Sequence, residues 1–155
     1  MAGTLQREIR QTKAIALLEE EASLNIIRTA DLLMRRITEL FKHHNLSPAQ
    51  YNVLRILRGA GKEGASCKDI GERLLARDPD ITRLMDRLEG RRLVVRGRAK
   101  EDRRVVTHCL TKEGLALVNA LDRPMDKLHR GVMRGVPHAK LKDLISTLEE
   151  IRIQL

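Results

Sequence analysis

The sequence predicts a mainly α-helical fold with a small β-hairpin, arranged as a winged helix-turn-helix flanked by N- and C-terminal dimerisation helices. Two short amphipathic segments within residues 66–89 are separated by a break at residues 76–79, which indicates two helices joined by a tight turn. Two runs rich in β-branched residues follow between residues 93 and 110, around a charged tip at residues 99–104. Longer amphipathic segments lie on both sides of this stretch.

The composition of the 155-residue chain fits one domain, or a compact pair of subdomains, with an aliphatic core. With one Phe, one Tyr and no Trp, the chain is poorly equipped to recognise single-stranded nucleic acid by base stacking. The net charge of +9, from 30 basic and 21 acidic residues, favours a polyanionic partner, either nucleic acid or an anionic membrane surface. The alternative is a basic protein without such a partner.

Residues 1–45 are expected to form an N-terminal helix that belongs to a dimerisation body. Within a predicted helix over residues 5–44, Ile26, Leu33 and Leu40 recur every seven residues and form a narrow apolar seam. A helix of this length cannot bury its seam against a small domain alone, so we infer an intermolecular partner. Packing of the helix within its own chain is the alternative.

Residues 46–110 are expected to form the winged helix-turn-helix domain. Its first helix begins at a capping box made by Ser47 and Gln50, and its second at a capping box made by Ser66 and Asp69.

The third helix of this domain carries a polar face suited to duplex DNA. Asp78 is its expected cap and Pro79 its expected first-turn residue. Its buried stripe consists of Ile81, Leu84, Met85 and Leu88. Its opposite face presents Asp80, Thr82, Arg83, Asp86 and Arg87. Near the N-terminus of a helix in the major groove, Arg83 could fork onto guanine, while Arg87 would meet phosphate. Asp80 would repel phosphate unless it pairs with a basic neighbour or accepts from cytosine.

The hairpin tip is basic, with Lys100, Arg103 and Arg104 close together. A guanidinium at such a tip can enter a narrow minor groove, where the potential is most negative. Asp102 can hold Arg104 in a fixed orientation through a bidentate pair. A solvated tip with incidental charges is the alternative, and the preceding helix-turn-helix pattern favours the DNA contact.

Residues 111–155 are expected to form the C-terminal dimerisation helices. Thr111 can cap the first of them, Pro124 predicts a kink or a local break, and a last helix starts at about His138. The apolar positions of the last helix are Leu141, Leu144, Ile145, Leu148, Ile151 and Leu155.

Two motifs carry a resemblance to a known family. The wing motif consists of Asp102, Arg103 and Arg104 followed by Leu110, Thr111 and Gly114. The helix motif consists of Ile81, Thr82, Arg83 and Leu84 followed by Asp86, Arg87, Leu88 and Glu89. With these motifs in matching order and spacing from about residue 25 to the C-terminus, the chain resembles the multiple antibiotic resistance regulator (MarR) family of bacterial transcription factors.

The resemblance implies a homodimeric, sequence-specific transcriptional regulator, expected to be a repressor, whose two winged domains read a pseudo-palindromic operator in double-stranded DNA. Arg104, oriented by Asp102, would enter the minor groove. The major-groove residues would be Pro79, Asp80, Thr82 and Arg83. The full set of expected DNA contacts is Ser66, Lys68, Pro79, Asp80, Thr82, Arg83, Arg87, Lys100, Asp102, Arg103 and Arg104.

Three positions depart from the family pattern, and one of them is Pro124, within the long dimerisation helix that it is expected to bend. Leu75 occupies the turn, where many helix-turn-helix proteins have Gly, and Arg92 stands where the family commonly has Gly. We expect Gly90 to supply the flexibility that the chain needs at this point.

The resemblance also implies a small-molecule effector, often phenolic or anionic, bound between the dimer body and the winged domain. His43, His44 and Tyr51 are candidate contacts, and solvated histidines at a helix end are the alternative. Cys67, at a helix start, and Cys109, in the wing strand, are candidates for oxidation, against a structural role as buried cysteines. No cofactor and no metal site are expected, because the cysteines and histidines lack ligand spacing.

Two competing functions and the location complete the expectations. One alternative is a winged-helix module that binds protein instead of DNA, in which loss of Arg103 and Arg104 would leave function unimpaired. An enzyme is disfavoured, because the sequence has no nucleophile–base pair, glycine-rich phosphate loop or paired carboxylates in a recognisable pattern. No signal peptide or membrane-spanning run is visible, so the cytoplasm is the expected location.

Overall fold

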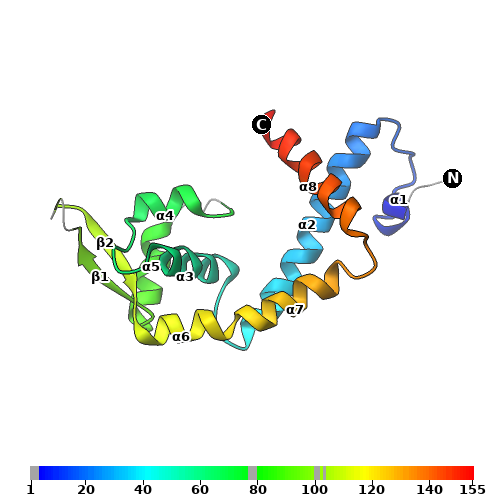
Figure 1. Cartoon of the computed structure of the whole chain (residues 1–155). Helices are drawn as coiled ribbons and strands as arrows, with labels where there is room; N and C mark the ends of the chain where they lie inside the picture. Colours follow the sequence, from blue (N-terminus) through cyan, green and yellow to red (C-terminus); the bar gives the residue numbers. More distant parts are fainter. Residues whose placement is uncertain (1–3, 77–79, 100–101, 103) are drawn as a thin grey trace.

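The computed structural model describes residues 4–76, 80–99, 102 and 104–155, and it has two parts (Figure 1). The winged lobe contains helices α3 (Pro48–Ala60), α4 (Cys67–Arg73) and α5 (Ile81–Gly90) and strands β1 (Val94–Arg98) and β2 (Val106–Leu110). The arm contains α1 (Thr4–Glu8), α2 (Leu18–Lys42), α7 (Asp122–Val132) and α8 (His138–Ile153). Helix α6 (Lys112–Ala120) runs along the base of the winged lobe and leads into α7. The predicted fold class, mainly α-helical with one hairpin, is confirmed.

Helix α3 lies at the centre of the winged lobe and is buried over much of its surface. It packs against α2, α4, α5, α6 and β2. Val53, Leu54 and Leu57 are fully buried, and each such aliphatic side chain stabilises the fold by about 1.5–3 kcal/mol. Tyr51 packs against Phe41 of α2, with ring centroids 4.5 Å apart. The rest of the winged lobe and the end of the arm are therefore positioned by one helix.

The helix caps predicted at Ser47, Ser66 and Thr111 are confirmed. The Ser47 hydroxyl accepts from the backbone NH of Gln50 at 3.1 Å, and the Gln50 side chain accepts from the backbone NH of Ser47 at 2.9 Å. Ser66 and Asp69 form the same reciprocal pair at the start of α4, and Thr111 caps α6. These boundaries are encoded locally, because each box satisfies backbone NH groups that the first helical turn leaves without partners.

The N-terminal region is not one continuous helix, so the prediction of a helix over residues 5–44 is wrong. Residues 9–17 separate α1 from α2, and Arg10 in this connection has a φ of 53°, a left-handed conformation that ends a right-handed helix. The predicted apolar seam is also divided. Leu40 packs against the chain's own core, whereas Ile26 is 38% exposed.

The turn from α5 into β1 depends on an arginine in the left-handed region. Arg92 has a φ of 57°, while Gly90 is the last residue of α5. The expectation that Gly90 supplies the flexibility is therefore wrong, and Arg92 adopts the conformation itself, at a steric cost of roughly 1–2 kcal/mol.

The predicted interruption of the long C-terminal helix is confirmed. Helix α6 ends before Leu121, which is fully buried, and α7 begins directly after it. Pro124 lies in the first turn of α7, where a missing NH removes no intrahelical hydrogen bond.

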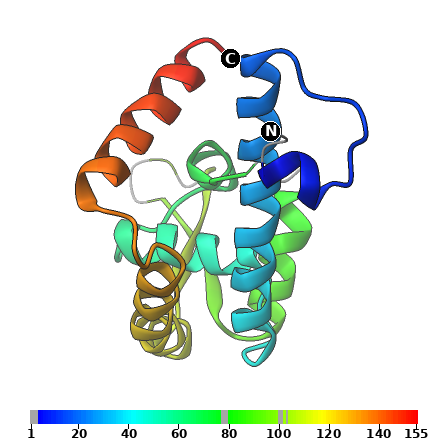
Figure 2. The same ribbon diagram turned by 90° about the vertical axis from the view of Figure 1, so that its right-hand side faces the viewer.

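The arm leaves apolar side chains uncovered. No residue of α8 is buried, and Figure 2 shows α8 and α2 as two helices inclined to each other rather than packed along their lengths. Leu144 and Ile145 of α8 are 47% and 56% exposed, and Ile27 of α2 is 66% exposed. Apolar faces of this kind mark contact surfaces.

Within the described part of the chain, none of the helices combines the length and the apolar character needed to cross a membrane.

Replacement of Gly114 by Ala should destabilise the protein by about 1–3 kcal/mol, because the added Cβ would lie 2.0 Å from the carbonyl oxygen of Leu93. Chemical denaturation would measure the free energy of unfolding. Gly90→Ala is the matched control, since nothing lies within 4 Å of its Cβ position. Equal stability of Gly114→Ala and the wild type would contradict the close approach of α6 to the start of β1.

Acidification should lower the melting temperature of the wild type more than that of a His108→Gln variant. His108 is 2% exposed, and its pKa is lowered from 6.5 by burial first and by the charge of Arg96 second. The unfolded chain therefore binds this proton more readily than the folded chain. The associated stability is complete above pH 6.5 and is lost as the pH falls from there through the folded pKa. Parallel pH profiles of the two melting temperatures would contradict this.

Candidate DNA-binding interface

Helices α4 and α5 form the helix-turn-helix, and the polar face of α5 is exposed as predicted. Leu84, Met85 and Leu88 are buried against the lobe, whereas Thr82 and Arg87 are exposed. The two helices cross closely, because a Cβ at Gly71 would lie 2.6 Å from the Cδ1 of Ile81. The sequence thus builds a helix with one apolar face inside the lobe and one polar face in solvent.

Asp80 is the N-cap of α5, a role that the sequence interpretation gave to Asp78. One carboxylate oxygen of Asp80 accepts from the backbone NH of Arg83 at 3.1 Å, and the other lies 3.0 Å from the Nε of Arg83. The helix consequently begins at Ile81. Asp78 and Pro79 lie outside the described residues. The pairing that the sequence required of Asp80 is present, and it directs the exposed side chain of Arg83 back towards the start of α5.

The base of the wing tip is closed by backbone hydrogen bonds. The NH of Ala99 donates to the carbonyl of Val105, and the NH of Val105 donates to the carbonyl of Asp102, both at 3.0 Å. A carboxylate oxygen of Asp102 accepts from the backbone NH of Arg104 at 2.9 Å. Asp102 therefore orders the backbone at Arg104, instead of the bidentate pair with its guanidinium that the sequence suggested. Arg104 is exposed, and Lys100 and Arg103 lie outside the described residues.

An ion-pair cluster that sequence reasoning missed joins the wing to α5. Arg96 of β1 pairs with Asp86, and its Nε lies 2.9 Å from an oxygen of Glu89. The two carboxylates are three residues apart on α5 and hence lie on one face of that helix. The sequence did contain a signal for this cluster: the basic residue Arg96 occupies an exposed position of the strand that follows the acidic face of α5. The cluster orients the wing relative to α5, although each exposed pair contributes only about 1 kcal/mol or less to folding.

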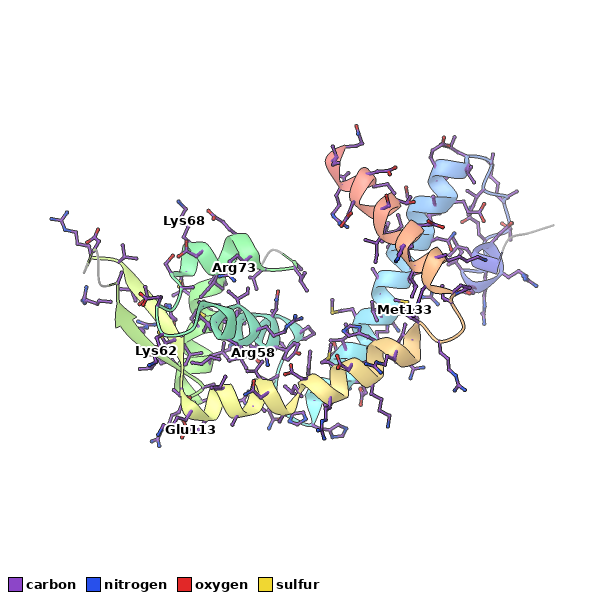
Figure 3. The ribbon with its side chains drawn as sticks, in the orientation of Figure 1. Arg58, Lys62, Lys68, Arg73, Glu113 and Met133 are labelled. Carbon is purple, nitrogen blue, oxygen red and sulfur yellow. The ribbon has the colours of Figure 1, made fainter. Side chains whose placement is uncertain are left out.

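A hollow of about 490 Å³ lies between the start of α4, α5 and the wing. Its lining includes Ser66, Lys68 and Thr82, three of the predicted DNA contacts. The hydroxyl of Ser66 already donates to Asp69 at 2.7 Å as part of its cap. Lys68 projects from the outer side of α4 (Figure 3). The structure thus brings residues from α4, α5 and the wing around one surface depression.

Cys67 lines the same hollow, and burial raises the pKa of its thiol. The lowering that a helix start can produce is therefore not the dominant effect here. Cys109 is partly buried, with its sulfur 3.6 Å from the carbonyl oxygen of Lys62.

The candidate effector contacts occupy different environments. His43 lines a cavity of about 640 Å³ between α2 and α7, together with Arg36 and Lys127. The carbonyl of His44 accepts a hydrogen bond from a side chain of the winged lobe. Tyr51 is 6% exposed, and burial raises the pKa of its hydroxyl. Among these three, only His43 borders the cavity.

Comparisons with known proteins agree with this geometry. A family model described as MarR family matches residues 44–105. The chain is 26% identical over 133 residues to the homoprotocatechuate degradative operon repressor of Escherichia coli, covering 86% of this chain and 88% of that protein.

Two solved structures extend the match over most of the chain. The crystal structure of a MarR transcription factor from Planctomyces limnophilus is 40% identical, covers 87% of this chain and 98% of its own, and matches with a TM-score of 0.67. The crystal structure of CouR from Rhodococcus jostii RHA1 bound to p-coumaroyl-CoA is 25% identical, covers 88% and 95% of the two chains, and has a TM-score of 0.75. With its helix-turn-helix, its wing and this degree of identity, the chain belongs to the MarR family of DNA-binding transcriptional regulators.

Proposed function

We propose that the protein is a homodimeric repressor that reads a pseudo-palindromic operator in double-stranded DNA. Residues 46–110 would form the DNA-binding domain, and residues 1–45 and 111–155 would form the dimer body. One observation carries the proposal: a helix with an exposed polar face and a basic wing share one lobe, while the arm attached to that lobe leaves its apolar faces uncovered.

In this proposal α5 enters the major groove and the wing enters the minor groove. Thr82 and Arg83 are exposed near the start of α5, where side chains reach base edges. Arg83 can turn from Asp80 to a guanine, so the acid holds it ready in the free protein. Arg104 would enter the minor groove from a tip whose backbone Asp102 orders. Arg87, Ser66 and Lys68 would contact phosphates, and sequence position alone supports the roles of Pro79, Lys100 and Arg103.

The dimer would bury the apolar faces of α2 and α8. Both helices belong to the arm, and α8 contributes no residue to the core of its own chain. Its apolar positions at 141, 144, 145 and 148 recur at helical spacing, so they form a stripe that a second copy can cover. Pairing through the arm would leave both winged lobes free for two half-sites.

An effector would bind in the cavity between α2 and α7. Arg36 and Lys127 supply positive charge at its rim beside the acid Glu39, His43 adds an imidazole, and Leu40, Pro124 and Leu128 supply an apolar wall. This combination suits a small anion with an apolar or aromatic body, and the related CouR carries p-coumaroyl-CoA in its structure. Occupancy would release DNA if the ligand favours a lobe spacing that misses the half-sites. The protein would act in the cytoplasm, where a bacterial chromosome lies.

The purified protein should bind duplex DNA from the region beside its own gene, with an affinity that falls roughly 10³-fold or more between 50 and 200 mM salt. Footprinting and fluorescence anisotropy would measure the binding site and the affinity.

Arg83→Ala should remove about 1–3 kcal/mol of discrimination between the specific site and random duplex. Arg104→Ala should weaken binding to both by similar factors.

Arg134→Ala, an exposed substitution on the arm, is the control for loss of charge. An unchanged sequence preference in Arg83→Ala would show that α5 is not the reading helix. Unimpaired function after replacement of Arg103 and Arg104 together would favour a protein-binding module instead.

Sedimentation equilibrium should give a dimer at micromolar concentration, and Ile145→Glu should shift it towards monomer, because a charge would enter the apolar stripe of α8. Glu150→Gln on the same helix is the control, since it removes a charge without touching the stripe. A stable wild-type monomer at this concentration would refute the dimer.

A further inference from the structure

The chain passes between the arm and the winged lobe twice. At each of these two crossings, an arginine of the lobe forms hydrogen bonds with residues of the connection or beside it. The first crossing is the connection from α2 to α3 at residues 43–47, and the second is the joint at Leu121 between α6 and α7. At the first crossing, Arg91 donates from Nη1 to the carbonyl oxygen of Asn45 at 2.5 Å and from Nη2 to that of His44 at 3.0 Å. Arg91 directly follows α5, so the helix proposed to read DNA is tied to the end of the arm.

At the second crossing, Arg58 of α3 contacts both sides of the joint. Its Nη1 and Nη2 donate to the two carboxylate oxygens of Asp122 at 2.8 and 3.0 Å, and Nη1 also donates to the side-chain oxygen of Asn119 at 2.9 Å. Asn119 belongs to the last turn of α6, and Asp122 is the first residue of α7. The hydrogen bond between Arg58 and Asp122 raises the pKa of Arg58 and lowers that of Asp122, so the pair is charged at neutral pH.

These contacts restrict the orientation of the winged lobe relative to the arm more than they stabilise the fold. Each uses a planar guanidinium with two or more donors engaged, and such a fork is satisfied in only one orientation. Helix α6 packs on α3 and β2, whereas α7 packs on α2 of the arm. A change of angle between lobe and arm must therefore bend the chain at Leu121 and at residues 43–47, and it would break the forks at both places.

We propose that Arg58 and Arg91 are positioning residues that set the angle between the winged lobe and the arm, and with it the half-site spacing that the dimer accepts. This rests on the proposed function, in which two lobes are joined through their arms. Each added base pair between half-sites moves the second one by about 3.4 Å and turns it by about 35°. A lobe with a fixed angle cannot follow both changes, while a lobe on a loose hinge can.

The test compares two duplexes: the operator selected by the wild-type protein from random sequence, and the same operator with one base pair inserted at its centre. The wild type should lose the contribution of one half-site on insertion, an affinity loss on the order of 10²-fold. In the double variant Arg58→Gln, Arg91→Gln the loss should shrink to less than about tenfold. The control is Arg134→Gln, which removes an exposed guanidinium in the connection from α7 to α8, at neither crossing. It should keep the wild-type ratio.

A double variant that is folded and keeps the wild-type ratio would overturn the proposal. If the double variant does not fold, Asp122→Asn weakens the fork from the arm side, and its ratio decides in the same way. Exchange of the pair, Arg58→Glu with Asp122→Arg, should restore the wild-type discrimination between the two duplexes. If the exchanged variant still failed to discriminate between them, the role assigned to the pair would be overturned.

Small-angle scattering of the free proteins separates this proposal from the proposed function. The double variant should show a broader distribution of interatomic distances than the wild type at equal oligomeric state. Identical distributions would overturn the positioning role of Arg58 and Arg91, whatever is observed with DNA. A wild type that binds no duplex would refute the proposed function alone, and the scattering result would still decide the positioning role.

Discussion

The burial of α3 is the constraint on which the rest of the structure depends. This helix contacts α2 of the arm, both other helices of the lobe, the return strand of the wing and α6. A helix surrounded in this way needs apolar or satisfied side chains around much of its circumference, and Gln50, Val53, Leu54 and Leu57 meet this requirement. Because neighbouring elements share one partner, a change in the packing of α3 would move the reading helix, the wing and the arm together.

The basic surface of the winged lobe is not a collection of free charges. Arg83 pairs with Asp80, Arg96 with two acids of α5, and Asp102 holds the backbone of the wing tip. Such pairs contribute little to stability in solvent. They restrict the rotamers of long side chains before DNA arrives, so less conformational entropy remains to be lost on binding. The net charge of +9 attracts the protein to DNA, and the paired acids orient the arginine side chains.

The parts of the fold that the sequence predicted are those with local causes. Capping boxes at Ser47 and Ser66 and the apolar periodicity of α5 and α8 act within a few residues, so helix positions followed from spacing alone. The cap of α5 was misplaced by two residues because Asp78 and Asp80 are chemically equivalent candidates. The break after α1 and the left-handed Arg92 lack a Gly or Pro signal. The contacts of Arg58 and Arg91 join residues 46 to 64 positions apart, which no local pattern encodes.

The scarcity of aromatic residues gives the molecule an optical property. Its one tyrosine is Tyr51, and it has no tryptophan. This ring lies where α2 meets α3, packed on Phe41, with the guanidinium carbon of Arg55 5.9 Å from its centroid. The aromatic absorption band at the long-wavelength end of the near ultraviolet, and the tyrosine emission of the unlabelled protein, therefore come from a single buried phenol at the junction of arm and lobe. Any rearrangement of that junction would change the spectrum of the native chain without an introduced fluorophore.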